Sequence, residues 1–175
     1  MDGTTLKPAS AFLPPISLQW VIHGIGDFNG DSRSDILWRD TGSGATYLWL
    51  MNGSSAIGAG YTSSYADNTW TISGVGDMDG DGKSDVLWRH SAGAMYVWLM
   101  DGTALKPASA FLPPITTNWL IQGLRDFDGD SKADILWREE ASGNTYLWLM
   151  NGATAKSSGY TAAQAGNDWV IQAQR

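Results

Sequence analysis

From Trp119 to Arg138 the chain reads WLIQGLRDFDGDSKADILWR. Two earlier stretches read almost the same: WVIHGIGDFNGDSRSDILWR at Trp20–Arg39 and WTISGVGDMDGDGKSDVLWR at Trp70–Arg89. A fourth Trp-x-Ile segment begins at Trp169, so the starts are spaced by 50, 49 and 50 residues. Self-similarity at a fixed period of this length is typical of repeat architectures. The repeat therefore decides the fold.

Two short apolar runs follow the Asp-rich stretch in every repeat. The first reads Ile/Val-Leu-Trp-Arg, and the second reads Tyr-Leu/Val-Trp-Leu-Met and ends in Asn-Gly or Asp-Gly. Runs rich in Trp, Tyr, Ile and Val predict β-strands, and Asn-Gly or Asp-Gly predicts a tight turn. These runs are apolar on both faces, so we expect both faces to be buried. A blade packed between two neighbouring blades of a β-propeller has this property.

We therefore expect an all-β fold, a single β-propeller over residues 1–175 built of four-stranded antiparallel blades. Each blade is expected to run from an inner strand (20–24 in the first) through the Asp-rich loop and two middle strands to a more polar outer strand (56–62). A solenoid of hairpins is the alternative, but its units are usually shorter than these. The expected repeats are 20–69, 70–118 and 119–168, with an outer strand in 1–19 and an inner strand in 169–175 as incomplete pieces.

The number of blades does not close a ring. About three full blades are expected, whereas propellers generally have four to eight. Residues 1–16 also recur at 100–115 with one change, which indicates duplication of a two-blade unit or engineering. A lone chain would leave open sheet edges. We therefore expect either that chains complete each other's ring as a homo-oligomer or that the sequence is part of a longer protein.

Three nine-residue loops, 27–35, 77–85 and 126–134, are called loops 1, 2 and 3 here. Oxygen-bearing side chains stand at positions 1, 3, 5 and 9 of each loop, with Gly at position 4. A tight loop can point these side chains at one centre, and the backbone carbonyl of position 7 can join them. Six to eight oxygen ligands are what Ca²⁺ favours. The expected ligands of three Ca²⁺ sites are the side chains of Asp27, Asn29, Asp31, Asp35, Asp77, Asp79, Asp81, Asp85, Asp126, Asp128, Asp130 and Asp134, with the backbone carbonyls of Arg33, Lys83 and Lys132.

Other readings of the loops are weaker. Mg²⁺ prefers fewer protein ligands, and soft metals are disfavoured because no loop contains Cys or His. An EF-hand would need Gly at position 6 and Glu at position 12, which is Trp in all three repeats. Surface turns without metal remain the alternative. Since Asn29 removes one charge, loop 1 is expected to bind Ca²⁺ most weakly.

The pattern Trp-x-Ile-x-Gly-x-x-Asp-Phe-Asp-Gly-Asp-x-x-x-Asp-Ile-Leu-Trp-Arg resembles the FG-GAP or VCBS-type repeats of integrin-like β-propellers. This resemblance implies a calcium loop between the first and second strands of a blade, with side-chain ligands at positions 1, 3, 5 and 9. It also implies a secreted or cell-surface protein, since such repeats are commonly extracellular. Some relatives are sugar-binding lectins. The incomplete blade number departs from the pattern.

Composition and residue positions argue against several classes of function. Of the 18 acidic residues, 11 lie in the three loops, so the formal charge of −7 comes from these loops and not from the whole surface. The 11 basic residues form no stripe that would bind nucleic acid. No apolar stretch is long enough to span a membrane, and no export signal is recognised in this sequence. His23 and His90 do not recur in the other repeats, and nothing singles out Asp40, Glu139 or Glu140 as a catalytic pair. We therefore expect no enzyme.

Two function classes remain. The first is a non-catalytic binding or adhesion module for carbohydrate or protein. The second is a purely structural or assembly module that closes a ring. The 10 Trp residues are expected to serve mainly as blade-to-blade packing, and some Trp faces could stack on sugar rings.

Overall fold

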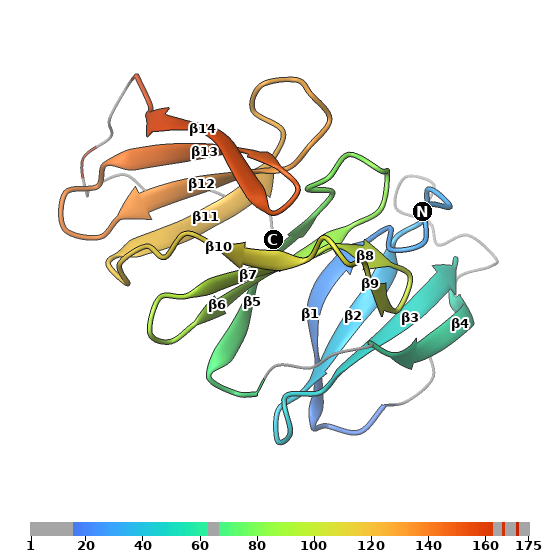
Figure 1. Cartoon of the computed structure of the whole chain (residues 1–175). Helices are drawn as coiled ribbons and strands as arrows, with labels where there is room; N and C mark the ends of the chain where they lie inside the picture. The colour runs from blue at the N-terminus through green and yellow to red at the C-terminus, as the bar shows by residue number, and fades with distance from the viewer. Residues whose placement is uncertain (1–15, 63–66, 163–165, 167–170, 172–175) are drawn as a thin grey trace, which may run out of the picture.

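The computed structural model describes residues 16–62, 67–162, 166 and 171. This part of the chain forms fourteen β-strands and no helix (Figure 1). None of it forms a helix long and apolar enough to cross a membrane. The strands are β1 (Trp20–Gly26), β2 (Asp35–Asp40), β3 (Thr46–Asn52), β4 (Ser55–Tyr61), β5 (Trp70–Gly76), β6 (Asp85–His90), β7 (Met95–Trp98), β8 (Met100–Asp101), β9 (Ala104–Leu105), β10 (Ala110–Leu112), β11 (Trp119–Arg125), β12 (Asp134–Glu139), β13 (Thr145–Asn151) and β14 (Thr154–Tyr160).

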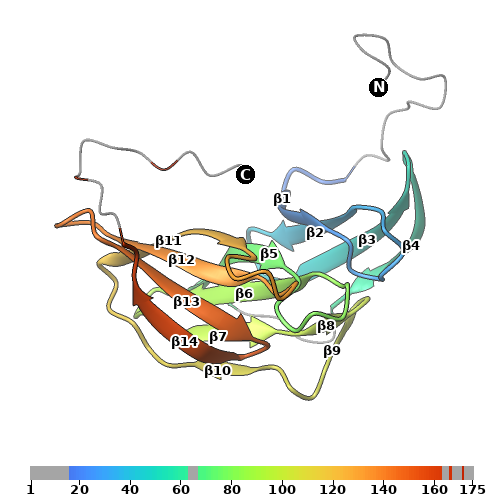
Figure 2. The same cartoon turned by 90° about the horizontal axis from the view of Figure 1, so that it is seen from above.

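The strands form three four-stranded antiparallel sheets and one small hairpin. The sheet orders are β1-β2-β3-β4, β5-β6-β7-β10 and β11-β12-β13-β14, and β8 pairs with β9. Figure 2 shows the three sheets side by side as blades, with β1, β5 and β11 next to one another and β4, β10 and β14 on the outside. The inner strands line a cavity of about 1190 Å³. The chain is a partial β-propeller, as the repeat predicts.

The middle blade shows why the strands are apolar on both faces. Val86 and Leu87 point to opposite faces of β6, and both are fully buried. In the first blade Ile36, the counterpart of Val86, is only partly buried, and in the third blade the same holds for Leu136, the counterpart of Leu87. The two outward faces therefore lack the cover that the middle blade receives from its neighbours.

Each blade fits into its neighbour at the inner strands. Val75 of β5 packs on Gly24 of β1, and a Cβ at Gly24 would collide with it. Leu124 packs on Gly74 in the same way. At the far end of the blade, the guanidinium of Arg39 lies 4.7 Å from the ring centre of Trp88 in the next blade. A small residue and a cation–π contact thus recur at each seam.

The second blade departs from the expected single outer strand. Its polypeptide forms β9 and then, after Pro107, β10, and only β10 pairs with the sheet. Proline lacks an N–H group and cannot continue a ladder, which explains the interruption. The expected incomplete pieces fall mostly outside the described residues, since 1–15, 167–170 and 172–175 are not among them.

Candidate metal centre

The position-1 carboxylates organise the three loops. In loop 1 the Asp27 side chain accepts backbone hydrogen bonds from Gly30 at 2.7 Å and from Ser32 at 2.6 Å. Asp77 and Asp126 receive the same bonds from the residues at positions 4 and 6 of their loops. Positions 4 and 6 both have positive φ in every loop. Position 4 is always Gly, whereas Ser32 and Ser131 hold the left-handed conformation at position 6 that sequence reasoning missed.

The position-9 carboxylates are buried, and each accepts two backbone amides of its own blade. We call this pair of hydrogen bonds a clasp. Asp85 is fully buried, and its Oδ2 accepts the amide of Met78 while its Oδ1 accepts the amide of Met100, both at 2.8 Å. Asp35 and Asp134 hold the corresponding amides of their own blades. Burial raises the pKa of Asp85 to about 7, although the two amide bonds act in the opposite direction. Each clasp joins the loop to the second strand and to a later strand of the same blade, which is β3 in the first, β8 in the second and β13 in the third, so position 9 has a structural role beside any metal ligation.

The structure gathers acidic oxygens in two of the loops. Oxygens of Asp77, Asp79 and Asp85 lie within 4.8 Å of one another, and so do those of Asp126, Asp128 and Asp130. Among the described residues, Asp81 and Asp134 are not part of these groups, and loop 1, with Asn29 at position 3, forms no such group of three acids. Asp31 turns instead to Arg33, with Oδ2 3.0 Å from the guanidinium.

The donor chemistry of the loops fits a hard divalent cation. All expected side-chain ligands offer oxygen, and the position-5 carboxylate keeps one oxygen outside the bond that it makes to the position-7 amide, as Asp81 does with Lys83. Carboxylates brought this close repel one another unless a cation lies among them. Oxygen-only donors of this kind suit Ca²⁺.

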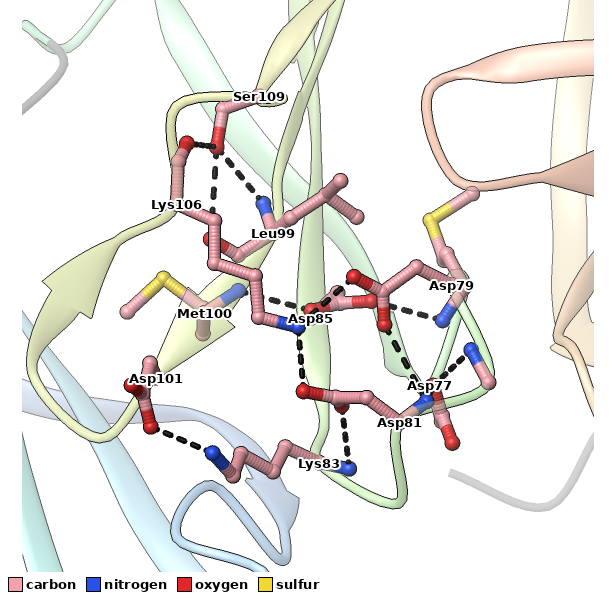
Figure 3. A network of polar contacts seen from close by, with 12 residues as sticks. Asp77, Asp79, Asp81, Lys83, Asp85, Leu99, Met100, Asp101, Lys106 and Ser109 are labelled. Atoms are coloured by element: carbon pink, nitrogen blue, oxygen red, sulfur yellow. Dashed lines mark hydrogen bonds and ion pairs between the residues drawn. The ribbon is translucent and has the colours of Figure 1, made fainter.

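Lys106, which follows β9, and Lys156 on β14 contact loops 2 and 3, and sequence reasoning missed them. The Lys106 ammonium lies 2.7 Å from Asp79 Oδ2 and 2.5 Å from Asp81 Oδ2 (Figure 3). Lys156 reaches Asp128 Oδ2 at 2.8 Å and also contacts Asp130. The signal was a lysine at matching places after the second and third Asn-Gly or Asp-Gly turn, with Ile57 after the first.

The other acidic candidates cap turns. Asp40 Oδ1 accepts the backbone amides of Gly42 and Ser43 at 3.0 and 2.7 Å. Glu139 accepts hydrogen bonds from Asn118 and Ser142. Hydrogen bonds from Ser43 hold the pKa of Asp40 below its ordinary value. These carboxylates are satisfied in their own blades, which is the opposite of a poised general acid.

A second surface feature repeats once per blade, and we call it the aromatic platform. In the first blade Trp20 and Tyr47 lie under Tyr61, whose ring centre is 6.1 and 4.9 Å from theirs. Tyr61 is 64% exposed. The other two platforms have the same plan and consist of Trp70, Tyr96 and Phe111, and of Trp119, Tyr146 and Tyr160.

Comparison with known families identifies the repeat. Residues 27–88 match the family described as FG-GAP-like repeat. This stretch is therefore similar to an FG-GAP-like repeat. The matched stretch begins at position 1 of loop 1 and ends at Trp88, so it covers loops 1 and 2 but not the inner strand β1. A search among curated proteins gave no match.

Proposed function

We propose that this chain is a calcium-stabilised, non-catalytic β-propeller module that binds carbohydrate on its aromatic platforms. The observation that carries the calcium part is the convergence of three acidic oxygens in loop 2 and three in loop 3. The FG-GAP-like repeat at 27–88 supports a propeller-type module, and such repeats are generally non-catalytic. We place the protein outside the cell, secreted or at the cell surface.

Calcium would supply the positive charge that the crowded carboxylates need. The oxygens of positions 1, 3, 5 and 9 and the position-7 carbonyl would hold it, as the spacing predicts. The chain's own residues already shape the site, because the position-1 carboxylate gathers loop amides and the position-9 carboxylate anchors the loop to the sheet. Cation binding would therefore stiffen the connection between inner and second strands.

The aromatic platforms support carbohydrate as the ligand. Tyr61, Phe111 and Tyr160 are each nearly two-thirds exposed, although large aromatic residues are usually more buried. Each lies edge-on against a half-buried Tyr, which fixes its orientation at low cost in conformational entropy. Flat, rigid aromatic faces suit the apolar faces of sugar rings. Their repetition would make binding multivalent.

A second function, self-assembly, is favoured by the two outward faces. At the inner seams, the amide of Ser84 donates to the Asp27 carbonyl at 2.5 Å, and the amide of Gly102 donates to the Phe28 carbonyl at 2.9 Å. Equivalent bonds join the second blade to the third. The matching donors of the first blade are Ser34 and Gly53, and the matching acceptors of the third blade are the carbonyls of Asp126 and Phe127.

These two faces complement each other. Phe127 is 48% exposed whereas Phe28 and Met78, its counterparts, are fully buried. Ile25 is 63% exposed, while Gly123, the place where such a side chain packs at an inner seam, has no neighbour among the described residues within 4 Å of a built Cβ. We therefore propose a second copy of this chain as the occupant, docked head to tail. Such heterologous contacts form a ring when the rotation closes.

Arg125 is the residue that does not fit this complementarity. It stands where the inner seams have Gly26 and Gly76, and a Cβ at Gly76 would lie 3.0 Å from Ala133 Cβ of the next blade. In a seam between copies, Arg125 would face Ser34. The seam between copies must therefore be wider at this point than the inner seams.

Two measurements test the proposal. Glycan-array binding in calcium, compared with binding after chelation, tests recognition, and absence of binding to every glycan sinks the carbohydrate part. Light scattering tests assembly, because the chain mass is 18.9 kDa and a head-to-tail assembly must give a multiple of it. A stable monomer over the whole concentration range refutes the second copy.

A further inference from the structure

In loops 2 and 3, a lysine ammonium binds the carboxylate oxygens that Ca²⁺ would use. Lys106 follows β9 directly, and its backbone is fixed on both sides: its amide donates to the Leu99 carbonyl at 2.7 Å, and its carbonyl accepts the Ser109 hydroxyl at 2.8 Å. From this anchor the ammonium bridges Asp79 and Asp81 (Figure 3). The side chain is therefore placed on the loop by a built contact.

The third blade repeats this arrangement from a regular strand. Lys156 lies on β14 and bridges Asp128 and Asp130, the same loop positions 3 and 5. Burial acts to lower the pKa of Lys106, but the hydrogen bonds to Asp79 and Asp81 outweigh it and raise the pKa above its ordinary value. Both lysines are therefore fully charged at neutral pH.

The first blade differs in two linked ways. Position 3 of its loop is the neutral Asn29, and the counterpart of the lysines is Ile57 on β4, which is 59% exposed. Where the loop has four carboxylates there is a lysine, and where it has three there is none. Four carboxylates with one ammonium carry the same net charge as three carboxylates.

We propose that Lys106 and Lys156 are built-in counter-ions that compete with calcium for positions 3 and 5 of loops 2 and 3. This inference rests on the proposed calcium binding. Asp79 Oδ2 and Asp81 Oδ2 cannot serve an ammonium and Ca²⁺ together, because the two cations repel at such distances. Calcium must therefore displace the lysine, and when calcium is absent the ammonium offsets one of the four carboxylate charges and keeps loops 2 and 3 ordered.

The competition reverses the order of affinities that charge counting predicts. Counting carboxylates alone makes loop 1 the weakest site. With the lysines included, loops 2 and 3 each lose two charge-assisted hydrogen bonds to an ammonium on binding calcium. Loop 1 loses the exposed contact between Arg33 and Asp31 and a long hydrogen bond of 3.4 Å from the Asn29 amide to Asp31. Loop 1 is therefore the tightest site.

The test follows each loop separately in the full chain. The amides of Gly30, Gly80 and Gly129 each donate to the position-1 carboxylate of their own loop at 2.7 Å, so their NMR resonances report the three loops individually. In a calcium titration, Gly30 should reach its midpoint at the lowest concentration. In Lys106→Met the midpoint of Gly80 should fall about tenfold while Gly129 stays unchanged.

Lys156→Met is the matched control, since it should move Gly129 and leave Gly80 in place. Lys106→Arg keeps the positive charge, so loop 2 should bind calcium as weakly as it does in the original chain. Ile57→Lys is the converse variant at an exposed site that does not endanger folding, and it should raise the midpoint of Gly30. In chelator, Lys106→Met should melt at a lower temperature than the original protein.

The outcomes separate this inference from the function on which it rests. If the resonances respond to calcium but Gly80 has the same or a higher midpoint in Lys106→Met, the competition is wrong and the calcium sites stand. If Lys106→Met is as stable as the original chain in chelator, the counter-ion role is wrong. If no loop responds to calcium in any variant, the proposed calcium function fails and the competition fails with it.

Discussion

The buried carboxylate of Asp85 accepts the backbone amide of Met100 at 2.8 Å and so clasps the start of β6 to β8. Its other oxygen holds the amide of Met78 in loop 2. The same clasp occurs in all three blades, through Asp35 and Asp134. Since its two oxygens hold amides of the loop and of the following strand, the clasp fixes the root of the loop on the sheet.

Replacing the clasp should destabilise the chain strongly. Asp85→Ala leaves two buried amides without acceptors, each at about 1–3 kcal/mol, so the free energy of unfolding should fall by about 2–6 kcal/mol in urea denaturation. Asp101→Asn is the control, because Asp101 is exposed and the other two blades carry Asn at this place. It should cost less than about 0.5 kcal/mol. Equal losses for the two variants would contradict the clasp.

Position 6 of the loops offers a reciprocal pair of variants. Ser32 and Ser131 have φ of 65° and 67°, whereas loop 2 has Gly82 at φ 83°. A left-handed residue other than Gly costs about 1–2 kcal/mol. Ser32→Gly should therefore raise the free energy of unfolding by about 1 kcal/mol, and Gly82→Ser, with open space around its Cβ, should lower it by a similar amount. Changes of the opposite sign would show that the loops adopt another backbone conformation.

Much of this structure could be predicted from sequence, for a physical reason. Strand runs such as 85–89 carry apolar residues on both faces, and only packing between two sheets buries both, so the propeller follows from local pattern. Spacing also predicts that the position-1 carboxylate points into the loop, where it accepts loop amides. The dual role of Asp85 does not follow from spacing, because its second partner lies on another strand.

The lysines were missed because their contact is non-local. Lys106 is close to Asp79 only after β8 and β9 fold back over loop 2 (Figure 3). The split outer strand of the second blade was missed although Pro107 marks it, since the other outer strands are continuous. Sequence repetition predicts what the blades share, and it conceals the places where one blade differs.

If glycans bind on the aromatic platforms, removing two of the exposed rings should weaken glycan binding without destabilising the fold. Tyr61→Ala combined with Tyr160→Ala should weaken binding to any glycan found on the array by about tenfold or more, because exposed aromatic anchors dominate such contacts. The melting temperature should change little, since both rings are mostly exposed. Ser157→Ala, on the same strand as Tyr160, serves as the control. Undiminished binding by the double variant would place the ligand site elsewhere.

Two substitutions in the proposed seam between copies should change self-association in opposite directions. Ile25→Asp puts a charge on an exposed apolar residue that an incoming copy would cover, so it should abolish self-association and leave the monomer folded. Arg125→Gly restores the small residue of the inner seams and should tighten association. Light scattering over a concentration series measures both. The reverse order of the two variants would contradict head-to-tail docking.

Calcium stabilisation is the central claim, and scanning calorimetry of the full chain in calcium and in chelator tests it most directly. At a calcium concentration 100 times the dissociation constant, one site adds about 2.7 kcal/mol, and 1 kcal/mol moves the melting temperature of a domain this size by about 2–4 °C. We predict a melting temperature at least about 5 °C higher in calcium than in chelator. Equal melting temperatures in the two solutions would contradict the account.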